Sequence, residues 1–398
     1  MNKCLVTKLN GSSNNSELRR LGEMRMKILK VSNPTDVTQG FAIGVNKPVV
    51  LKIVDNGYFT DRTLTVNKGK TITLNIGYND VFVNNDNVEI AILDKYSITE
   101  LSFYPSQTSA AYIRNKYFNL SDLEYSTALT SLNLTNLQIT GDIVNLKNLT
   151  SLTYLNLVNS QITGDIVNLK NLTSLTFLNL VNSQVTGDIA NLNGLTALTS
   201  LNLANSQVNG DIVNLKNLTS LTFLNLNDSQ VNGDIVNLKN LTSLTSLNLD
   251  NSQVNGDIVN LKNLTALTVL SISNTNVTGD IVNLKNLTRI GKELMLKGLN
   301  ISGNIGDLPN QVLFVSNKTG RGNFTWTTSS RTNILAMEDI ACDNIDKLLQ
   351  DMSNMNANFA GQQSYYKIIK LIGTRTSASD AAVQTLQSKG YTVSISNA

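Results

Sequence analysis

Residues Leu152–Ser174 read LTYLNLVNSQITGDIVNLKNLTS, and this pattern recurs through the middle of the 398-residue chain. Its Gly-Asp-Ile triplet begins every 23 residues, at Gly141, Gly164, Gly187, Gly210, Gly233, Gly256 and Gly279, and a degenerate Gly-Asn-Ile follows at Gly303. A fixed period of this length is typical of proteins built from stacked structural repeats. No single repeat can bury its own apolar residues, so neighbouring repeats must bury them together in one continuous core.

Each repeat predicts one short strand followed by a turn. Leu155 and Leu157 point inward and Asn156 points outward, because successive side chains of a strand alternate between its two faces. The glycine of the triplet suits a turn with positive φ. The rest of the inner wall is predicted at Ile162, Ile166, Leu169 and Leu172.

This spacing resembles the leucine-rich-repeat family, whose units read L-x-x-L-x-L-x-x-N-x-L, and the resemblance covers about 180 residues. The glycine-isoleucine portion is similar to variants whose convex side is extended rather than helical. A hydroxyl replaces the family's asparagine and can still bond the turn backbone. The residues at this position are Ser160, Ser183, Ser206, Ser229, Ser252 and Thr275, with Leu137 in the first unit.

Around the repeats the sequence predicts a mainly β fold with some α structure, in three domains. These are a β-rich N-terminal docking domain at 1–112, a leucine-rich-repeat solenoid at 113–308 and an α/β C-terminal cap at 309–398. Short alternating apolar runs favour an antiparallel sandwich or barrel in the first domain. The runs are Met24–Ile28, Ile72–Ile76 and Val88–Ile92, with turn residues at 67–69 and 84–87.

The C-terminal cap is predicted to combine helices and strands. A helix is expected at Asn344–Met355 and a strand at Lys367–Gly373. A second helix, capped by Ser377 or Ser379 and ended by Gly390, then leads to a strand at Tyr391–Ser396. Such a cap would cover the end of the solenoid, where core leucines would otherwise be exposed.

Composition argues against enzymatic chemistry. The chain has no histidine, which removes the commonest general base and the commonest metal ligand. Cys4 and Cys342 have no metal-ligand spacing, and no nucleophile has a histidine partner. The sequence therefore predicts no enzyme, no catalytic residue, no metal and no cofactor, and a net charge of +3 gives no reason to expect a nucleic-acid partner.

The repeat period aligns outward residues into rows on the predicted concave sheet, because equivalent strands stack side by side. An asparagine row and a partly aromatic row form the candidate ligand-binding face, which would suit a polar ligand such as a glycan. The alternative is a solvated sheet in which the amides satisfy one another. The candidate residues are Tyr154, Asn156, Phe177, Asn179, Asn202, Phe223, Asn225 and Asn248.

A second set of rows is charged. Aspartate follows each repeated glycine, from Asp142 to Asp280, and lysine stands five residues later in every coil but one, where Asn193 replaces it. The aspartates lack the Gly-Gly-x-Gly-x-Asp pattern of calcium-binding repeats. We expect them to accept hydrogen bonds from turn backbone instead.

Both ends of the chain resemble leucine-rich-repeat proteins encoded by phages of gut bacteria, which are similar to virion appendage proteins. The matching stretches are Lys3–Leu9, Leu21–Arg25, Gly373–Asp380 and Lys389–Tyr391. The resemblance implies a structural protein of the phage tail or head, such as a tail fibre that takes part in host attachment. It would be made in the host cytoplasm and incorporated into the virion.

In that hypothesis the N-terminal domain docks on other virion proteins and the solenoid binds a host-surface glycan or protein, with a homo-oligomer possible. No apolar segment is long enough to span a membrane and no export signal is recognised, so membrane insertion is not expected. The alternatives are a bacterial cell-surface or secreted adhesin and an intracellular protein-binding scaffold.

Overall fold

The computed structural model describes residues 119–136, 139–290, 293–304, 306, 308, 337–354 and 368–396, together with the strands named below that lie between 26 and 104 and between 311 and 334. The chain forms two compact units. One is Met1–Leu152 with Ser160–Ile162, and the other is Thr153–Asn159 with Thr163–Ala398.

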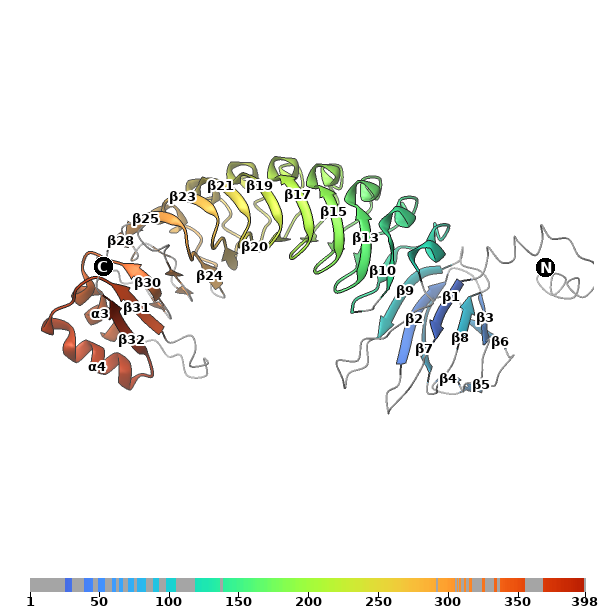
Figure 1. Cartoon of the computed structure of the whole chain (residues 1–398), viewed down its shortest axis with the longest axis horizontal. Coiled ribbons are helices and arrows are strands. Elements are labelled where there is room, and N and C mark those ends of the chain that lie inside the picture. The colour runs from blue at the N-terminus through green and yellow to red at the C-terminus, as the bar shows by residue number, and fades with distance from the viewer. Residues whose placement is uncertain are drawn as a thin grey trace, which may run out of the picture. The chain divides into compact units, whose positions relative to one another are not determined.

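The first unit contains the antiparallel strands predicted for the N-terminal region (Figure 1). One sheet has the order β1 (Met26–Lys30), β8 (Glu89–Ile92), β3 (Val49–Ile53), β6 (Thr71–Leu74). A second runs β9 (Ile98–Tyr104), β2 (Gln39–Val45), β7 (Gly77–Val83), β4 (Phe59–Asp61), β5 (Leu64–Val66). Strands β1, β6 and β8 overlap the three predicted apolar runs, whereas the two predicted turns lie outside the described residues.

The first coil of the solenoid continues the second sheet of this unit. It comprises η3 (Leu120–Leu123), β10 (Ser131–Asn133), β11 (Thr140–Asp142) and η4 (Ile143–Leu146). Strand β10 pairs in parallel with β9, and the Thr130 amide and hydroxyl both donate to the Thr99 carbonyl oxygen, at 2.7 and 3.0 Å. Ile98 and Leu101 are fully buried. Strand β9 therefore covers the apolar edge of the first coil, a role that the sequence did not reveal.

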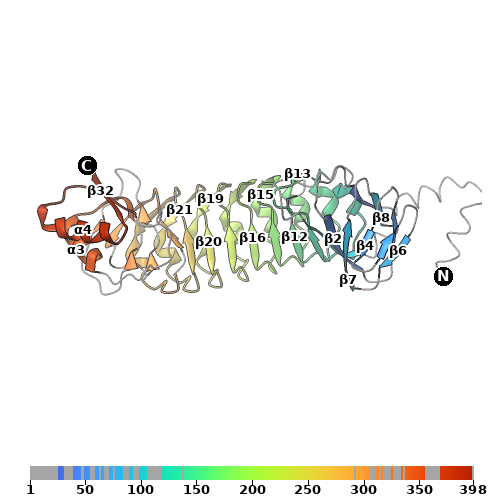
Figure 2. The ribbon, with the colours of Figure 1, turned by 90° about the horizontal axis from the view of Figure 1, so that it is seen from below.

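In the second unit the repeats form two rows of parallel strands. The leucine-strand sheet consists of β12 (Tyr154–Asn156), β14 (Phe177–Asn179), β16 (Ser200–Asn202), β18 (Phe223–Asn225), β20 (Ser246–Asn248), β22 (Val269–Ser271) and β24 (Glu293–Met295). Figure 2 shows β12, β16 and β20 as alternate strands of this row. Each strand is matched to the next one coil later, so that equivalent residues face each other.

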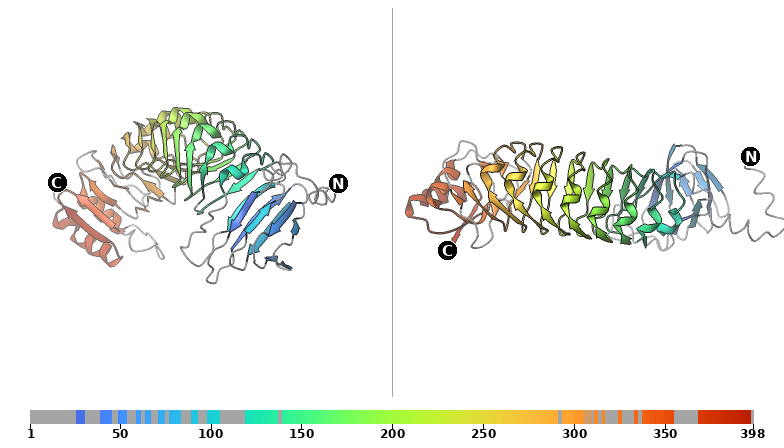
Figure 3. Two further views of the ribbon diagram at one scale, coloured as in Figure 1. Left: turned by 45° about the vertical axis from the view of Figure 1, so that its right-hand side comes forward. Right: turned by 90° about the horizontal axis from the view of Figure 1, so that it is seen from above.

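The glycine-strand sheet consists of β13 (Gln161–Asp165), β15 (Gln184–Asp188), β17 (Gln207–Asp211), β19 (Gln230–Asp234), β21 (Gln253–Asp257), β23 (Asn276–Asp280) and β25 (Asn300–Asn304). A 3-10 turn follows each of the first six, visible at the right of Figure 3: η5 (Ile166–Leu169), η6 (Ile189–Leu192), η7 (Ile212–Leu215), η8 (Ile235–Leu238), η9 (Ile258–Leu261) and η10 (Ile281–Leu284). The side predicted to be extended is thus a short strand followed by one helical turn.

The predicted inner wall is confirmed. Leu155, Leu157, Ile162, Ile166 and Leu169 are all 0% exposed, and equivalent residues of the other coils are buried in the same way. Full burial of one such side chain stabilises the fold by roughly 1.5–3 kcal/mol. The hydroxyls that replace the family's asparagine bond the turn backbone as predicted: Ser183 Oγ, for example, donates to the Leu180 carbonyl oxygen at 2.7 Å.

Parallel strands continue after the last Gly-Asn-Ile repeat. Strand β28 (Phe324–Thr325) pairs with β25, and β26 (Gln311–Val312) pairs with β29 (Asn333–Ile334). A parallel sheet then follows in the order β27 (Val315–Ser316), β30 (Met337–Ala341), β31 (Ile368–Ile372), β32 (Thr392–Ser396). Phe324 is 1% exposed and lies 21 residues after its partner Gly303. The stacking therefore extends by about one further coil, without the triplet that marks the others.

The predicted C-terminal helices and strands are present, with one difference in capping. They are α3 (Ile345–Asn354), β31, η13 (Ser377–Ser379), α4 (Asp380–Ser388) and β32. Ser379 occupies the N-cap position of α4, as one of the two predicted serines, but its side chain makes no cap bond there, and Thr376 caps the preceding η13 through its side chain. The Ser379 hydroxyl donates to Asp346 on α3 instead. Gly390 does end the second helix, with φ of +86°.

None of the helices in the described part of the chain is long and apolar enough to cross a bilayer.

Candidate binding face

The eight predicted contact residues lie in two adjoining rows on the outward side of the leucine-strand sheet. Parallel pairing aligns Tyr154 with Phe177 and Asn156 with Asn179, and the same register continues to Asn248. All eight side chains are half-buried. The structure therefore brings together Tyr154, Asn156, Phe177, Asn179, Asn202, Phe223, Asn225 and Asn248 on one surface.

The aromatic side chains are more enclosed than the sequence suggested. The Tyr154 and Phe177 rings stack with centroids 4.4 Å apart and planes inclined by 9°, so each ring covers part of the other. Asn156 Nδ2 donates to the Tyr154 hydroxyl oxygen at 3.2 Å. Phe223 is aligned between Ser200 and Ser246 of the flanking strands. The face thus carries one preformed aromatic pair and one separate ring.

The asparagine row has a structural task that the repeat pattern alone did not indicate. In each coil the side-chain oxygen accepts the backbone N–H two residues later, which fixes the turn that leaves the strand. The distance is 3.2 Å from the Val181 nitrogen to Asn179 Oδ1 and 2.9 Å from the Asp250 nitrogen to Asn248 Oδ1. One acceptor site of each amide is therefore occupied within its own coil, and fewer groups face a ligand than expected.

Hydrogen bonds between side-chain amides of successive coils, which the sequence offered as the alternative to a ligand site, occur in the row that begins three residues after the asparagine row. Asn182 Nδ2 donates to Asn159 Oδ1 at 2.7 Å, and Asn274 Nδ2 donates to Asn251 Oδ1 at 2.8 Å. The residues of this row have φ between +51° and +59°. Asparagine and aspartate tolerate this left-handed backbone better than other residues with a side chain. The row therefore stabilises the turn beside the sheet.

A threonine ladder, which was not predicted from the sequence, borders the aromatic row. Thr176 donates both its N–H and its hydroxyl to the Thr153 carbonyl oxygen, at 2.8 and 3.0 Å. The same pair of bonds recurs at Thr199, Thr222, Thr245 and Thr268. The signal in the sequence was the threonine immediately before each strand from β10 to β22, and these threonines couple one coil to the next.

The row two residues after the asparagine row changes from apolar to polar side chains along the sheet. Val158, Val181 and Ala204 precede Asn227 and Asp250 in this row. Ser271 Oγ and the Ser273 amide both donate to the Asp250 carboxylate. Burial raises the pKa of Asp250, although these hydrogen bonds lower it. Asn227 Oδ1 is buried and accepts no hydrogen bond within the described region. The face therefore has an apolar part and a polar, acidic part.

The repeated aspartates are structural, as predicted. Asp188 Oδ1 accepts the Ala190 N–H at 2.7 Å and so caps the 3-10 turn. The same carboxylate covers the Gly210 Cα of the next coil, where a Cβ would lie 2.2 Å from Oδ1. Asn191 Nδ2 donates back to the Asp188 carbonyl oxygen at 3.0 Å. Each repeated aspartate thus caps the 3-10 turn of its own coil and also packs against the repeated glycine of the next coil.

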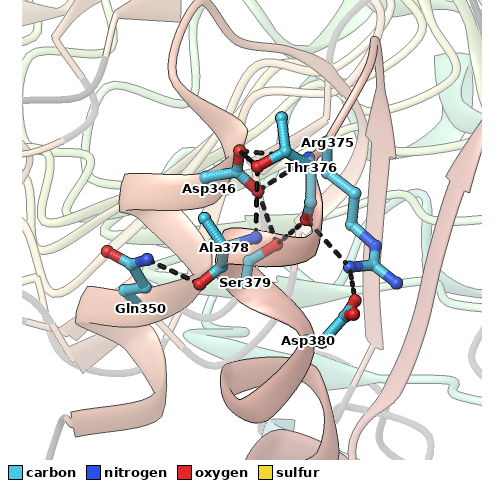
Figure 4. Close-up of polar contacts among 7 residues, drawn as sticks. All are labelled: Asp346, Gln350, Arg375, Thr376, Ala378, Ser379 and Asp380. Carbon is cyan, nitrogen blue, oxygen red and sulfur yellow. Dashed lines mark hydrogen bonds and ion pairs between the residues drawn. The ribbon is translucent and has the colours of Figure 1, made fainter.

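A polar network joins the helices of the C-terminal region (Figure 4). Asp346 accepts the Ser379 hydroxyl at 2.6 Å and the Thr376 hydroxyl at 2.7 Å, as well as the Thr376 amide. Slight burial opposes ionisation, but the hydrogen bonds from Ser379 and Thr376 outweigh it and lower the pKa of Asp346. Gln350 Nε2 donates to the Ala378 carbonyl oxygen at 2.8 Å. These bonds hold the loop after β31 against α3.

The residues of catalytic interest have no activating surroundings. Burial raises the pKa of the Cys342 thiol to about 11, so this sulfur is protonated and a poor nucleophile near neutral pH. Cys4 lies outside the described residues. Among the residues that the structure describes, no group of three or more acidic or cysteine side chains is placed to hold a metal ion.

Comparison with known proteins finds likeness in structure alone. No family model and no curated protein matches the chain. An internalin (inlF) from Listeria monocytogenes is 26% identical, with a TM-score of 0.53 over 77% of this chain and 85% of that one. The plant peptide hormone receptor RGFR1, solved in complex with RGF2, is 22% identical, with a TM-score of 0.53 over 70% of this chain.

The ectodomain of the Arabidopsis thaliana receptor kinase GASSHO1/SCHENGEN3 is 27% identical, with a TM-score of 0.49 over 56% of this chain. The present chain spans only 28% of that ectodomain and 41% of the RGFR1 chain.

Proposed function

We propose that this chain, whose repeats fold as a leucine-rich-repeat solenoid, is a non-enzymatic binding protein that contacts a protein partner through the leucine-strand sheet. The observation that carries the proposal is the stacked pair of Tyr154 and Phe177 on the outward face of that sheet. The fold does not require aromatic rings there, because Ser200 and Ser246 occupy equivalent positions in coils of the same geometry.

A protein partner fits this face better than a glycan. Half-buried valines, Val158 and Val181, border the asparagine row on the side away from the rings, so apolar groups flank the amides on both sides. The asparagines have already committed an acceptor to their own turns. Aromatic groups surrounded by polar residues are typical of the centres of protein interfaces. A host-surface glycan remains the alternative ligand for the same face.

Substitution of Tyr154, Phe177 and Phe223 by serine tests the proposal. Binders are first selected against the full chain from a displayed library of bacterial surface proteins. We expect the triple variant to bind them at least about tenfold more weakly, or about 1.4 kcal/mol. Its free energy of unfolding should fall by only about 1–2 kcal/mol, because one aromatic pair and half-buried area are lost.

The matched control places three serines on the glycine-strand sheet of neighbouring coils, at the exposed residues Gln184, Gln207 and Gln230. Binders whose affinity is unchanged by the aromatic variant but reduced by the glutamine control would place the contact surface on the glycine-strand sheet, which would contradict the proposal. The same pair of variants on a glycan array separates the two ligand classes, because only a glycan-binding face would give an array signal that depends on the rings.

The finer assignment that we propose is a phage virion protein, with the region 1–112 docking on other virion proteins and the solenoid contacting the host. Its support is the resemblance of the terminal stretches, of which Gly373–Asp380 forms the loop after β31, the turn η13 and the first residue of α4. Mass spectrometry of purified particles tests it: peptides of this chain at constant stoichiometry are expected, and their loss on gradient purification would contradict the assignment.

A bacterial surface or secreted adhesin is the second candidate. The observation that favours it is the likeness to an internalin from Listeria monocytogenes, which extends over most of both chains. Recovery of the chain from the surface fraction of bacteria free of phage particles would support this candidate over the virion protein.

A further inference from the structure

One coil replaces the lysine-asparagine pair of its neighbours with Asn193-Gly194. Asn193 follows the 3-10 turn η6, with φ of −58° and ψ of −24°, and its amide donates to the Ala190 carbonyl oxygen at 3.3 Å. Both residues are exposed. The equivalent pair one coil earlier is Lys170-Asn171.

The surroundings of Gly194 leave its backbone amide accessible. A Cβ built on this residue would meet no atom within 4 Å. Leu195, the next residue, donates its amide to the Leu192 carbonyl oxygen at 2.9 Å, but in the described region the Gly194 amide donates to no acceptor. The Asn193 side chain and the following N–H are therefore both open to solvent and little restrained.

Three other Asn-Gly pairs of the solenoid are held differently. Asn209, Asn232 and Asn255 are also exposed, but they lie within β17, β19 and β21, which are paired on both sides. The glycine after each has φ between +102° and +106°, and an aspartate oxygen of the preceding coil lies 2.1–2.2 Å from its Cβ position. Extended, paired backbone cannot bring the glycine nitrogen to the asparagine Cγ without opening the sheet.

We infer that Asn193 is a site of spontaneous deamidation, whereas the three strand asparagines are protected by the fold. The Gly194 nitrogen loses its proton to base and attacks Cγ of Asn193. An N–Cγ bond forms, the bond from Cγ to the amide nitrogen breaks, and ammonia leaves. Water then adds to either carbonyl of the resulting five-membered imide and opens it to aspartate or isoaspartate. Asparagine is one of the thermolabile residues of proteins.

The reaction changes the charge of the row of exposed lysines that follows the 3-10 turns. Asn193 occupies the position held by exposed lysines in the coils before and after it, at Lys170 and Lys216. The product places a carboxylate between these ammonium groups and lowers the formal net charge from +3 to +2. Isoaspartate also lengthens the backbone at the end of η6. The chain thus acquires a charge variant with age, at one identifiable coil.

Peptide mapping of the full chain tests the inference. Trypsin releases Asn171–Lys216 as one peptide, which contains both Asn193-Gly194 and Asn209-Gly210. During incubation of the folded protein at mildly alkaline pH, we expect Asn193 to convert at least about tenfold faster than Asn209, a difference of about 1.4 kcal/mol in the barrier. In urea the two sites should convert at similar rates, because both are followed by glycine.

Two variants complete the test. Asn193→Lys, which restores the residue of the neighbouring coils and adds a trypsin cleavage site after position 193, should abolish fast deamidation, so that only the slow conversion of Asn209 remains in the peptide that begins at Gly194. Gly194→Asn should slow the reaction at Asn193. Equal rates at Asn193 and Asn209 in the folded chain would overturn the inference, as would a rate at Asn193 that rises on unfolding as strongly as that of Asn209.

Discussion

Replacement of Gly210 by alanine tests how the Gly-Asp pairs join neighbouring coils. Gly210 has φ of +102°, which side chains with a Cβ rarely adopt, and its Cα faces the Asp188 carboxylate of the preceding coil. An added Cβ would lie 2.2 Å from Asp188 Oδ1 and 2.8 Å from Cγ. Either the backbone of β17 or the carboxylate must therefore move.

The expected loss of stability has two parts. Holding a residue with a Cβ at positive φ costs roughly 1–2 kcal/mol. Displacing Asp188 breaks the bond from the Ala190 amide to Oδ1, which is 2.7 Å long and caps η6. Loss of such a cap costs about 0.5–2 kcal/mol. Gly210→Ala should therefore lower the free energy of unfolding by roughly 1.5–4 kcal/mol.

Gly194→Ala is the matched control. This glycine lies in the same region, lacks positive φ and has open space around its Cβ position. Alanine there should change stability by less than about 1 kcal/mol, and in the stabilising direction, because it restricts the unfolded chain. Urea unfolding and hydrogen exchange of the amides in β15 to β19 measure both variants.

A double variant separates the two parts. Asp188→Ala alone should lose only the cap, and Gly210→Ala added to it should cost only the backbone strain of about 1–2 kcal/mol. Equal destabilisation by Gly210→Ala and Gly194→Ala would refute the steric argument. An undiminished effect of Gly210→Ala in the Asp188→Ala background would show that the carboxylate is not the obstacle.

Two further predictions concern the core and the C-terminal network. Leu201→Asp should unfold the neighbouring coils together and cost more than about 4 kcal/mol, because Leu201 is 0% exposed; an unchanged melting curve would contradict its inward position. Asp346, whose pKa is lowered in the folded chain, should stabilise the C-terminal region fully above the pKa of the unfolded carboxyl, near ~3.9, and lose this effect as pH falls through the folded pKa. Asp346→Asn should therefore flatten the acid dependence of melting at pH values below the ordinary pKa of the unfolded carboxyl, and an unchanged acid transition would show that other carboxylates control it.

The features that the sequence predicted well are those imposed on every coil by the same physical requirement. Leu155, Leu157 and Ile166 had to be buried because their equivalents recur at a fixed spacing, and an inward leucine fixes the outward direction of its neighbours. The same alternation, combined with the 23-residue period, is sufficient to predict that Tyr154 and Phe177 lie side by side.

Features that occur once were not predictable in this way. Strand β9 covers the first coil through Thr99, Ile98 and Leu101, but nothing periodic in the region before residue 119 indicates which strand pairs with β10. Phe324–Thr325 continues the glycine-strand sheet and Gln311–Val312 pairs with Asn333–Ile334. Neither strand carries the Gly-Asp-Ile triplet, so the spacing of the sequence did not reveal these pairings.

The asparagine row shows that repetition alone does not identify a ligand site. Asparagine recurs at this position from Asn133 to Asn248, before Ser271 replaces it, and the sequence left open whether a ligand needs it there. The side-chain oxygens of Asn156, Asn179 and Asn202 each accept the N–H of their own turn. A residue that every coil requires for its own turn recurs whether or not anything binds. Determinants of a particular partner are instead expected where the outward residue changes from coil to coil and no hydrogen bond of the repeat explains it. Two rows of the leucine-strand sheet meet that condition, the one with Tyr154, Phe177, Ser200, Phe223 and Ser246 and the one with Val158, Val181, Ala204, Asn227 and Asp250. They flank the asparagines on either side, so we expect partner selectivity to arise from the two variable rows, whereas the asparagines between them fix the turns of their own coils.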